Sequence, residues 1–166
     1  MSRAIAAGLA LGWVSDQLLG DPRRCHPVAG FGRVALAAED RLYADDCGSG
    51  AVFTGVLVGG AAGLGWVLQR AAGRSPVATA ALTALATWTV LGGRSLAREA
   101  QAIADALDAD DLVAAREGVS HLVSRDPSVL DEAGVARAAL ESVAENTSDA
   151  VVAPLLWGAV LGVPGL

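Results

Sequence analysis

Lysine is absent from this 166-residue chain, and all 12 of its strongly basic residues are arginines. This absence excludes a Walker-type phosphate loop, a Schiff-base enzyme and a lysine general base, because each of them needs a lysine amine. Any phosphate must therefore be bound by arginine, by backbone N–H groups or through a metal ion. The net charge of −6 provides no basic surface for nucleic acid, so we expect no nucleic-acid partner.

Charged side chains of either sign are also scarce, at 18% of residues, whereas globular domains average about 25%. The hydrophobic fraction is 53% and the mean hydropathy is +0.46. Long stretches carry no charge at all, so the deficit is concentrated in separate segments. The sequence has no strand signal. We therefore predict an all-α protein built as an integral membrane helical bundle.

Cysteine is limited to Cys25 and Cys47, which both fall in one polar segment. Two cysteines do not make a disulfide framework, so we expect two free thiols. The N-terminal apolar run is interrupted by Asp16 and shows no clear cleavage site. We interpret this run as a first membrane or re-entrant helix and not as a cleaved signal peptide.

The apolar segments organise the chain. The second and third are long enough to cross a bilayer, which takes about 20 apolar residues. Only the stretch from Arg70 to Arg74 separates these two segments, so they are predicted to form a transmembrane hairpin. We predict a single membrane domain, residues 1–166, with membrane segments at about 4–19, 48–69, 75–93 and 150–166.

Glycines repeat every four residues in several of these segments. Membrane helices pack closely at such positions, because the hydrophobic effect does not drive helices together in lipid. The triple repeat is the stronger indication of helix packing, and the pairs are weaker. The repeats are Gly55/Gly59/Gly63, Gly8/Gly12 and Gly158/Gly162.

Arginine counts predict the orientation in the membrane. Three arginines, Arg3, Arg70 and Arg74, lie on one side, and six lie on the other. The positive-inside rule places the larger group in the cytoplasm. We therefore expect a multi-pass cell-membrane protein whose polar segments 20–47 and 94–149 face the cytoplasm. The six arginines are Arg23, Arg24, Arg33, Arg41, Arg94 and Arg98.

The polar segments are predicted to be partly helical. Residues 20–47 read as a loop with one helix near 33–44. Residues 94–149 predict an amphipathic segment of three helices. The first covers about 95–108, the second is capped by Asp110 or Asp111, and the third is capped by Ser128 with Asp131 three residues on, as in a capping box.

A row of charged residues with four-residue spacing precedes the last apolar segment. Arg137, Glu141, Glu145 and Asp149 share one face of a helix. Adjacent like charges destabilise a helix, and anions near its C-terminus oppose the helix dipole. The arrangement therefore indicates a site for a cation, for a phosphate held through Mg²⁺, or for an arginine, with Asn146 extending the cluster. A solvated helix face is the alternative.

A second candidate is the proline-bounded turn at Asp21–Pro22 and His26–Pro27. Proline restricts its own backbone and that of the preceding residue, so this loop is predicted to be rigid. It could present His26 and Asp21 to a polar ligand. The alternative is a basic loop near the membrane, with a capping aspartate and an exposed histidine.

Two further candidates lie at helix junctions. Arg94 and Ser95 follow two glycines at the end of an apolar segment, where backbone N–H groups can point at an anion. Ser95 as an ordinary N-cap is the alternative. Arg125 and Asp126 form a charged pair between two predicted helices. A structural brace is the alternative for this pair.

Three motifs in this order resemble a known family: LLGDPRRCHPVAGFG (18–32), GRSLAREA (93–100) and VSRDPSVLDEAGVARAALESVAENTSDAVVAPLLW (123–157). The chain resembles the CobD/CbiB cobalamin-biosynthesis proteins, the membrane-bound adenosylcobinamide-phosphate synthases. The resemblance covers nearly all of the chain. Family members carry a further downstream half, so we expect this chain to correspond to the N-terminal half.

The resemblance implies an ATP-dependent amide ligase that attaches aminopropanol or its phosphate to a propionate of adenosylcobyric acid, which gives cobinamide. Such chemistry calls for Mg²⁺ and for positive groups around the phosphate that is transferred. On this reading the catalytic candidates are His26, Asp21, Arg125 and Arg137, the substrate-binding candidates are Arg94, Ser95, Asp126 and Asn146, and the Mg²⁺ ligands are Glu141, Glu145 and Asp149.

The expected partners are the corrinoid substrate, an amino alcohol phosphate, membrane lipid, and either a second copy or a downstream partner chain. Two other functions remain open from the residues. One is a catalytically incomplete membrane scaffold that binds a partner through residues 94–149. The other is a transporter-like subunit that uses Asp16 inside the membrane.

Overall fold

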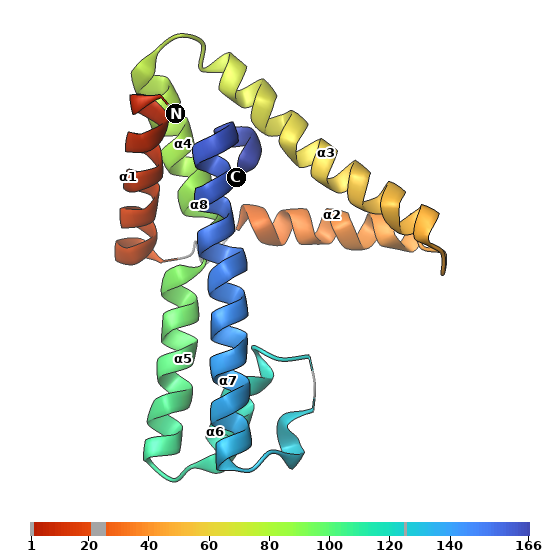
Figure 1. The fold of residues 1–166 in the computed structure, drawn as a ribbon, viewed down its shortest axis with the longest axis vertical. Helices are drawn as coiled ribbons and strands as arrows, with labels where there is room; N and C mark the ends of the chain where they lie inside the picture. The colour runs from red at the N-terminus through yellow and green to blue at the C-terminus, as the bar shows by residue number, and fades with distance from the viewer. Residues whose placement is uncertain (1, 21–25, 125) are drawn as a thin grey trace. The chain divides into compact units, whose positions relative to one another are not determined.

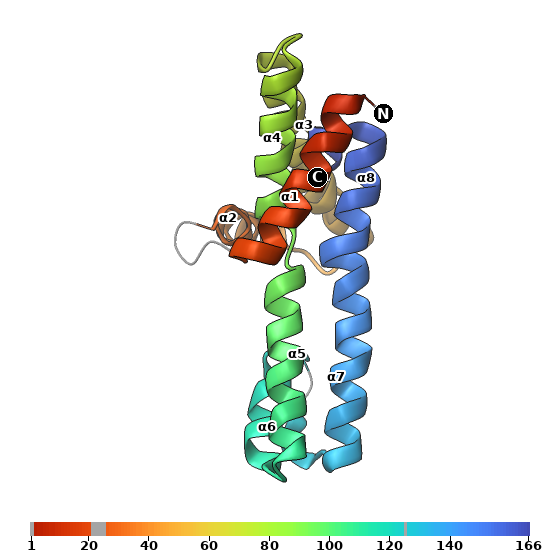
Figure 2. The ribbon, with the colours of Figure 1, turned by 90° about the vertical axis from the view of Figure 1, so that its left-hand side faces the viewer.

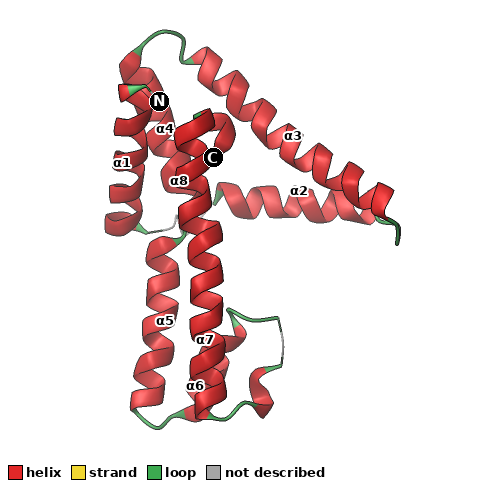
Figure 3. Cartoon of the chain, viewed as in Figure 1, coloured by secondary structure: helices red, strands yellow, loops and turns green. Residues whose placement is uncertain are grey.

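The computed structural model describes residues 2–20, 26–124 and 126–166, and across these ranges it contains helices and loops but no strand (Figure 3). The all-α prediction is confirmed. The chain divides into two compact units. Unit 1 comprises Met1–Leu91 with Pro154–Leu166, and unit 2 comprises Gly92–Ala153.

Unit 1 contains the apolar helices. By length and composition, the helix Cys47–Ala71 can cross a membrane, and so can the stretch Pro76–Asp108, which begins in unit 1 and continues into α5 of unit 2. Helix α2 runs crosswise to α1 and α4 (Figures 1 and 2). The elements are α1 (Arg3–Leu19), α2 (Pro27–Leu42), α3 (Cys47–Ala71), α4 (Pro76–Val90), most of α8 (Ala153–Leu161) and the 3₁₀ turn η3 (Val163–Gly165).

Helix α2 begins earlier than the helix predicted near 33–44. His26 caps it, since its Nδ1 atom accepts a hydrogen bond from the Val28 N–H at 3.2 Å. Pro27 occupies the first helical position, where its missing N–H costs nothing and its fixed φ suits a helix. Of the two prolines that indicated a loop, Pro27 therefore starts a helix, and Pro22 lies outside the described residues.

Helices α1 and α4 pack side by side and in parallel (Figures 1 and 2). Gly8 lies against Thr83, and Gly12 lies against Thr87; a Cβ atom added at Gly8 would meet the Thr83 Cβ at 2.5 Å. Both threonines are fully buried. This close backbone approach is the packing that the weaker glycine pair predicted.

The stronger glycine repeat behaves differently. A Cβ atom added at Gly55, Gly59 or Gly63 of α3 would meet no atom within 4 Å. For the part of the chain that the structure describes, the prediction of packing at this triple is wrong. Helix α3 instead contacts η3 through Gly65, where an added Cβ would lie 2.8 Å from the Pro164 Cα. Most of its apolar surface stays exposed, as expected of a helix that faces lipid.

Unit 2 is a set of amphipathic helices around a small aliphatic core. Helices α5 and α7 pack against each other and against α6. The core consists of Ile103, Ala115, Val119, Val135 and Ala138. The elements are α5 (Gly93–Asp108), α6 (Leu112–Ser120), the 3₁₀ turn η1 (Pro127–Val129), α7 (Glu132–Thr147) and the π-helical turn η2 (Ser148–Val152).

The predicted helix starts of unit 2 are partly confirmed. Asp111 caps α6 by accepting the Ala114 N–H at 3.0 Å. Ser128 does not cap α7, because it lies inside η1; Asp131 takes that position and accepts the Gly134 N–H at 2.8 Å. Ser95 is likewise not the cap of α5. Gly92 occupies that position, so the helix starts at Gly93.

Candidate functional site

An acidic pocket lies on the C-terminal half of α7. Glu141 and Glu145 line it from this helix, and the segment that follows α6 lines it from the other side. Its volume is about 300 Å³. The complete lining is Leu122, Val123, Ser124, Ala138, Glu141, Ser142 and Glu145. The four-residue spacing thus places two of the three predicted carboxylates in one pocket.

The first carboxylate of the row already has a partner. The Arg137 Nε–H donates to Glu141 Oε1 at 2.8 Å, one helical turn away, and both side chains are largely exposed. This hydrogen bond raises the pKa of Arg137 above its ordinary value. The pair offsets part of the repulsion between Glu141 and Glu145. Arg137, predicted to be catalytic, is therefore engaged with a predicted metal ligand.

Ser142 is a pocket residue that the sequence reasoning missed. It is nearly buried, and its hydroxyl donates to the Leu122 carbonyl at 2.7 Å. The side-chain amide of Asn146 donates to the Ser142 carbonyl at 2.8 Å and to its Oγ at 3.1 Å. Asn146 therefore fixes the position of Ser142, and Ser142 in turn links α7 to Leu122 on the opposite wall of the pocket. The four-residue spacing of Ser142 and Asn146 was the available signal.

A second group of predicted residues meets at the start of α5. The Gly92 N–H donates to the Ala150 carbonyl at 3.3 Å, and the Ser95 hydroxyl donates to the Gly92 carbonyl at 3.2 Å. No side-chain cap bond closes this helix N-terminus. Arg94 and Ser95 are thereby placed beside η2, which carries Asp149. Helix starts with open N–H groups favour anions.

Asp149 lies in the π-helical turn η2 and, unlike Glu141 and Glu145, does not line the acidic pocket. In η2 the Ala153 N–H bonds to the Ser148 carbonyl five residues back, so a spacing of four no longer keeps side chains on one face. Within the described ranges, no group of three or more His, Cys, Asp or Glu side chains could hold a metal ion. Among the described residues, Glu141 and Glu145 thus form a carboxylate pair that could bind a metal ion, and no third carboxylate completes a triad with them.

That pair still suits Mg²⁺. This ion keeps several water ligands and is commonly bound by one or two carboxylates together with substrate phosphates. Glu141 and Glu145 supply oxygen ligands of this kind at a pocket open to solvent. The Mg²⁺ assignment of Glu141, Glu145 and Asp149 therefore stays a prediction, and of the three only Glu141 and Glu145 line the acidic pocket.

Two other predicted residues have structural tasks. Asp126 caps η1 by accepting the Ser128 N–H at 2.9 Å, and the hydrogen bonds from Ser128 lower the pKa of this carboxyl. His26 caps α2 through Nδ1, so its ring carries the proton on Nε2 while the cap is formed. Nε2–H is then a donor.

The remaining catalytic candidates, Asp21 and Arg125, lie outside the described residues. His26 belongs to unit 1, whereas the acidic pocket and the start of α5 belong to unit 2. The structure therefore brings together Ser124 with the two glutamates, and Arg94 and Ser95 with the turn that carries Asp149.

Asp16 is the residue that the transporter-like alternative would use inside the membrane. It lies on the same stripe of α1 as Gly8 and Gly12, and it is only 1% exposed. Its Oδ2 atom accepts a hydrogen bond from the Gln17 amide at 3.0 Å. A buried carboxylate in an apolar helix is costly and usually has a function. The four-residue spacing from Gly12 was the signal for its burial.

These features define a class: an all-α protein with membrane-type helices and a polar helical unit that carries an acidic pocket. A family model described as CobD/Cbib protein matches residues 9–166. The chain belongs to the CobD/Cbib family, which the motifs at 18–32, 93–100 and 123–157 predicted.

Its curated relatives are cobalamin biosynthesis proteins CobD. The protein from Mycobacterium tuberculosis is 52% identical over 162 residues, which is 97% of this chain and 51% of the relative. The protein from Chromobacterium violaceum is 42% identical over 171 residues, covering 99% of this chain and 54% of the relative. The protein from Sinorhizobium fredii is 40% identical over 176 residues. The chain spans about half the length of these relatives, and no solved structure matches it.

Proposed function

We propose that this chain contributes to the adenosylcobinamide-phosphate synthase step of cobalamin biosynthesis. In this step an amino alcohol or its phosphate is joined to a propionate of adenosylcobyric acid with ATP. Membership in the family supports the pathway. The acidic pocket of unit 2 is the single structural observation that supports the reaction type.

The chemistry needs an activated carboxylate. A propionate oxygen attacks the γ-phosphorus of ATP and ADP leaves; the amine then attacks the acyl carbon, phosphate departs, and the amine loses a proton. Mg²⁺, when bound, would screen the charge of the phosphates. In this proposal Glu141 and Glu145 provide its oxygen ligands from one wall of the pocket. Arg137 balances the charge of Glu141.

The start of α5 is the second part of the proposed site. Arg94 supplies a guanidinium, and the first N–H groups of the helix point toward its N-terminus, where phosphate oxygens are favoured. The hydrogen bond from Gly92 to Ala150 fixes this helix start beside η2. We assign the phosphate groups of ATP or of the amino alcohol phosphate to this position.

We assign His26 to substrate binding and not to proton abstraction. Its Nδ1 atom is used by the α2 cap, which leaves Nε2–H as a donor for a carbonyl oxygen. The amide side chains of a corrinoid carry such oxygens. Asp21 and Arg125 keep the roles that the resemblance implies. The polar segments 20–47 and 94–149 are placed in the cytoplasm, where ATP is available, as the arginine counts predict.

The scaffold alternative invokes partner binding through the amphipathic helices of residues 94–149. These helices instead bury their apolar stripes against one another, around Ile103 and Val119. The apolar face that could bind a partner is thereby largely buried inside unit 2. This observation favours the enzymatic proposal.

Complementation tests the proposal. A bacterial strain blocked at cobinamide synthesis receives this chain alone, or this chain together with the second half of a curated CobD relative as a separate polypeptide. We expect at least the second arm to grow under conditions in which growth depends on the strain's own cobalamin synthesis. The double variant Glu141→Gln/Glu145→Gln should abolish growth, because neutral amides bind Mg²⁺ far more weakly than carboxylates.

The matched control is Glu132→Gln, which removes one charge from the first turn of the same helix, away from the acidic pocket. It should grow as the unmodified chain does, with equal amounts of each variant in the membrane fraction. No growth in either arm, or full growth of the double variant, contradicts the proposal.

A further inference from the structure

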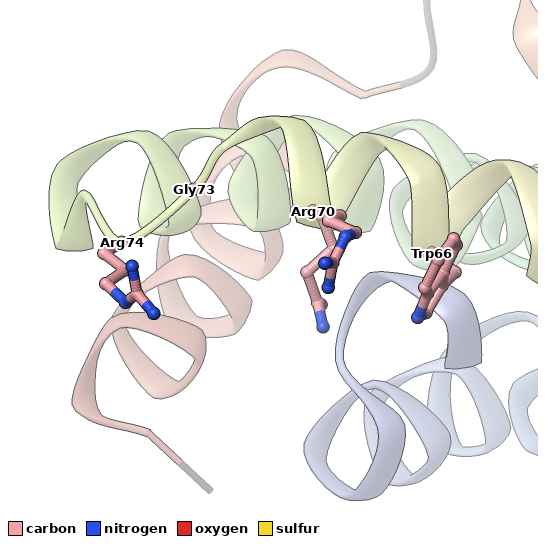
Figure 4. A pocket seen from close by; sticks show the side chains of 5 residues that line it. Trp66, Arg70, Gly73 and Arg74 are labelled. Atoms are coloured by element: carbon pink, nitrogen blue, oxygen red, sulfur yellow. The ribbon is translucent and has the colours of Figure 1, made fainter.

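The turn between α3 and α4 contains a cavity that the proposed function does not use. It has a volume of about 520 Å³ and is lined by Trp66, Gln69, Arg70, Gly73 and Arg74. Figure 4 shows Trp66, Arg70 and Arg74 extending from the same side of α3 and of the turn. The cavity belongs to unit 1, so it is distinct from the acidic pocket of unit 2.

The position of this cavity is set by the apolar helix that leads to it. Helix α3 is 25 residues long and can cross a membrane, and Arg70 lies in its last turn. An arginine and a tryptophan at the end of such a helix belong at the level of the lipid headgroups. The cavity therefore opens where phosphate groups of the bilayer lie.

The two guanidinium groups are available to a ligand. The Arg70 guanidinium lies over the Trp66 ring, with its Cζ 5.6 Å from the ring centroid. This contact orients the group without neutralising it. Within the described part of the chain, neither Arg70 nor Arg74 forms an ion pair with a carboxylate, and no acidic side chain lines the cavity.

The backbone of the turn keeps the cavity in place. Gly73 has a φ of 65°, a conformation that residues with a side chain rarely adopt. Gln69 is tied to η3, since its Oε1 atom accepts the Val163 N–H at 2.9 Å. On the other side Ser75 caps α4 by accepting the Ala78 N–H at 3.2 Å. Arg70 thus lies in the last turn of α3, next to the Gln69 that contacts η3, and Arg74 lies in the turn between Gly73 and the Ser75 cap.

We propose that this cavity binds the phosphate group of an anionic membrane lipid. A guanidinium presents two parallel N–H donors that match the oxygens of a phosphate, and two such groups face this one cavity. Free phosphate shares that chemistry. The apolar helix surface beside the cavity favours the lipid, because acyl chains can lie along α3 while the headgroup reaches Arg70 and Arg74.

Native mass spectrometry of the full chain in detergent tests this inference. Phosphatidylglycerol is added as the anionic probe, and phosphatidylcholine as the zwitterionic one. We expect one retained phosphatidylglycerol per chain. The variant Arg70→Gln/Arg74→Gln should weaken retention about tenfold or more, since each lost bond to a charged group is worth at least that factor.

The matched control is Arg33→Gln/Arg41→Gln, which removes two arginines from α2 and leaves the cavity unchanged. It should retain the lipid. Trp66→Leu keeps both charges but removes the ring under Arg70, so it should weaken retention by a smaller factor. This third variant separates the contribution of the Trp66 ring from that of the two arginine charges.

Three outcomes overturn the inference. The first is equal retention of the two lipids by the unmodified chain. The second is equal weakening by the cavity variant and the α2 variant, which would mean that only total charge matters. The third is displacement of the lipid by an equal concentration of inorganic phosphate, which would assign the cavity to the free ion.

Discussion

The two units of this chain are both helical, but the helices inside each unit pack by different means. In unit 1, α1 and α4 meet through Gly8 and Gly12 against buried threonines, with backbones in close approach. In unit 2, the helices meet through an aliphatic core around Val119 and Val135. The first kind of packing is common among helices in lipid, and the second is common among helices in water.

The difference shows what each sequence pattern can specify. Burying aliphatic side chains stabilises a contact only where water is the alternative environment. In lipid the alternative is already apolar, so shape and close approach decide which helices pair. A stripe of small residues, as on α1, and a stripe of large aliphatic residues, as on α5, can therefore each specify a helix contact, the first by close approach and the second by burial.

The largest effect is expected from the core of unit 2. Ile103→Ala should destabilise this unit by about 2–5 kcal/mol, because the side chain is fully buried and its removal leaves a cavity. Hydrogen–deuterium exchange of α5, α6 and α7 in the full chain measures the loss of protection. Val113→Ala on exposed α6 surface is the control and should change little.

Glycine substitutions test the packing of unit 1. Gly12→Ala should destabilise the α1–α4 contact by about 1–3 kcal/mol, because the new Cβ would overlap Thr87. Gly59→Ala should have no cost or be slightly stabilising, since alanine is the better helix former and the position is open. Thermal unfolding in detergent compares them. Equal effects at the two positions would contradict the distinction between the stripes.

The wall of the acidic pocket provides a smaller effect. Ser142→Ala removes the donor to the Leu122 carbonyl and should destabilise unit 2 by about 1 kcal/mol. Exchange of the amides around residues 122–124 should increase most. Ser120→Ala is the control, because Ser120 is exposed and its hydroxyl donates to the Glu117 carbonyl of the same helix. A uniform response across unit 2 would exclude a local role for Ser142.

The smallest effect depends on pH. The pKa of Asp126 is lower in the folded chain than in the unfolded chain, since Ser128 donates to the carboxylate. Its stabilising contribution is therefore complete above the unfolded value of about 3.9 and is lost as the pH falls through the lower folded value. The melting temperature of Asp126→Ala should be below that of the unmodified chain at pH 6. This difference should vanish under acid conditions, and a difference that persists there would contradict the cause given.

Much of the fold could be predicted from the sequence. Hydropathy located α1, α3 and α4, and apolar periodicity located α5 and α6, because these patterns follow directly from what each helix buries or exposes. The α7 start was misplaced at Ser128. The capping rule permits both Ser128 and Asp131. In the structure Ser128 lies inside the 3₁₀ turn η1, which leaves Asp131 as the cap of α7.

The candidate site was less predictable. The spacing of Glu141 and Glu145 predicts that they share a face, but it does not show that Ser142 ties this face to Leu122. The change to π-helical geometry after Thr147 has no signal in local propensity, so the position of Asp149 could not be derived. The glycine repeat Gly55/Gly59/Gly63 on α3 was also not predictable in this respect. Its spacing allows another helix to pack closely, but it does not show which helix, if any, does so.

The most direct test of the proposed function is equilibrium binding of ATP to the purified full chain, with and without Mg²⁺. The account predicts Mg²⁺-dependent binding that Glu141→Gln/Glu145→Gln weakens about tenfold or more, as expected when ligands to a charged group are lost, and that Glu132→Gln leaves unchanged. Binding that is absent, that does not depend on Mg²⁺, or that is weakened equally by Glu132→Gln would contradict the assignment of the acidic pocket.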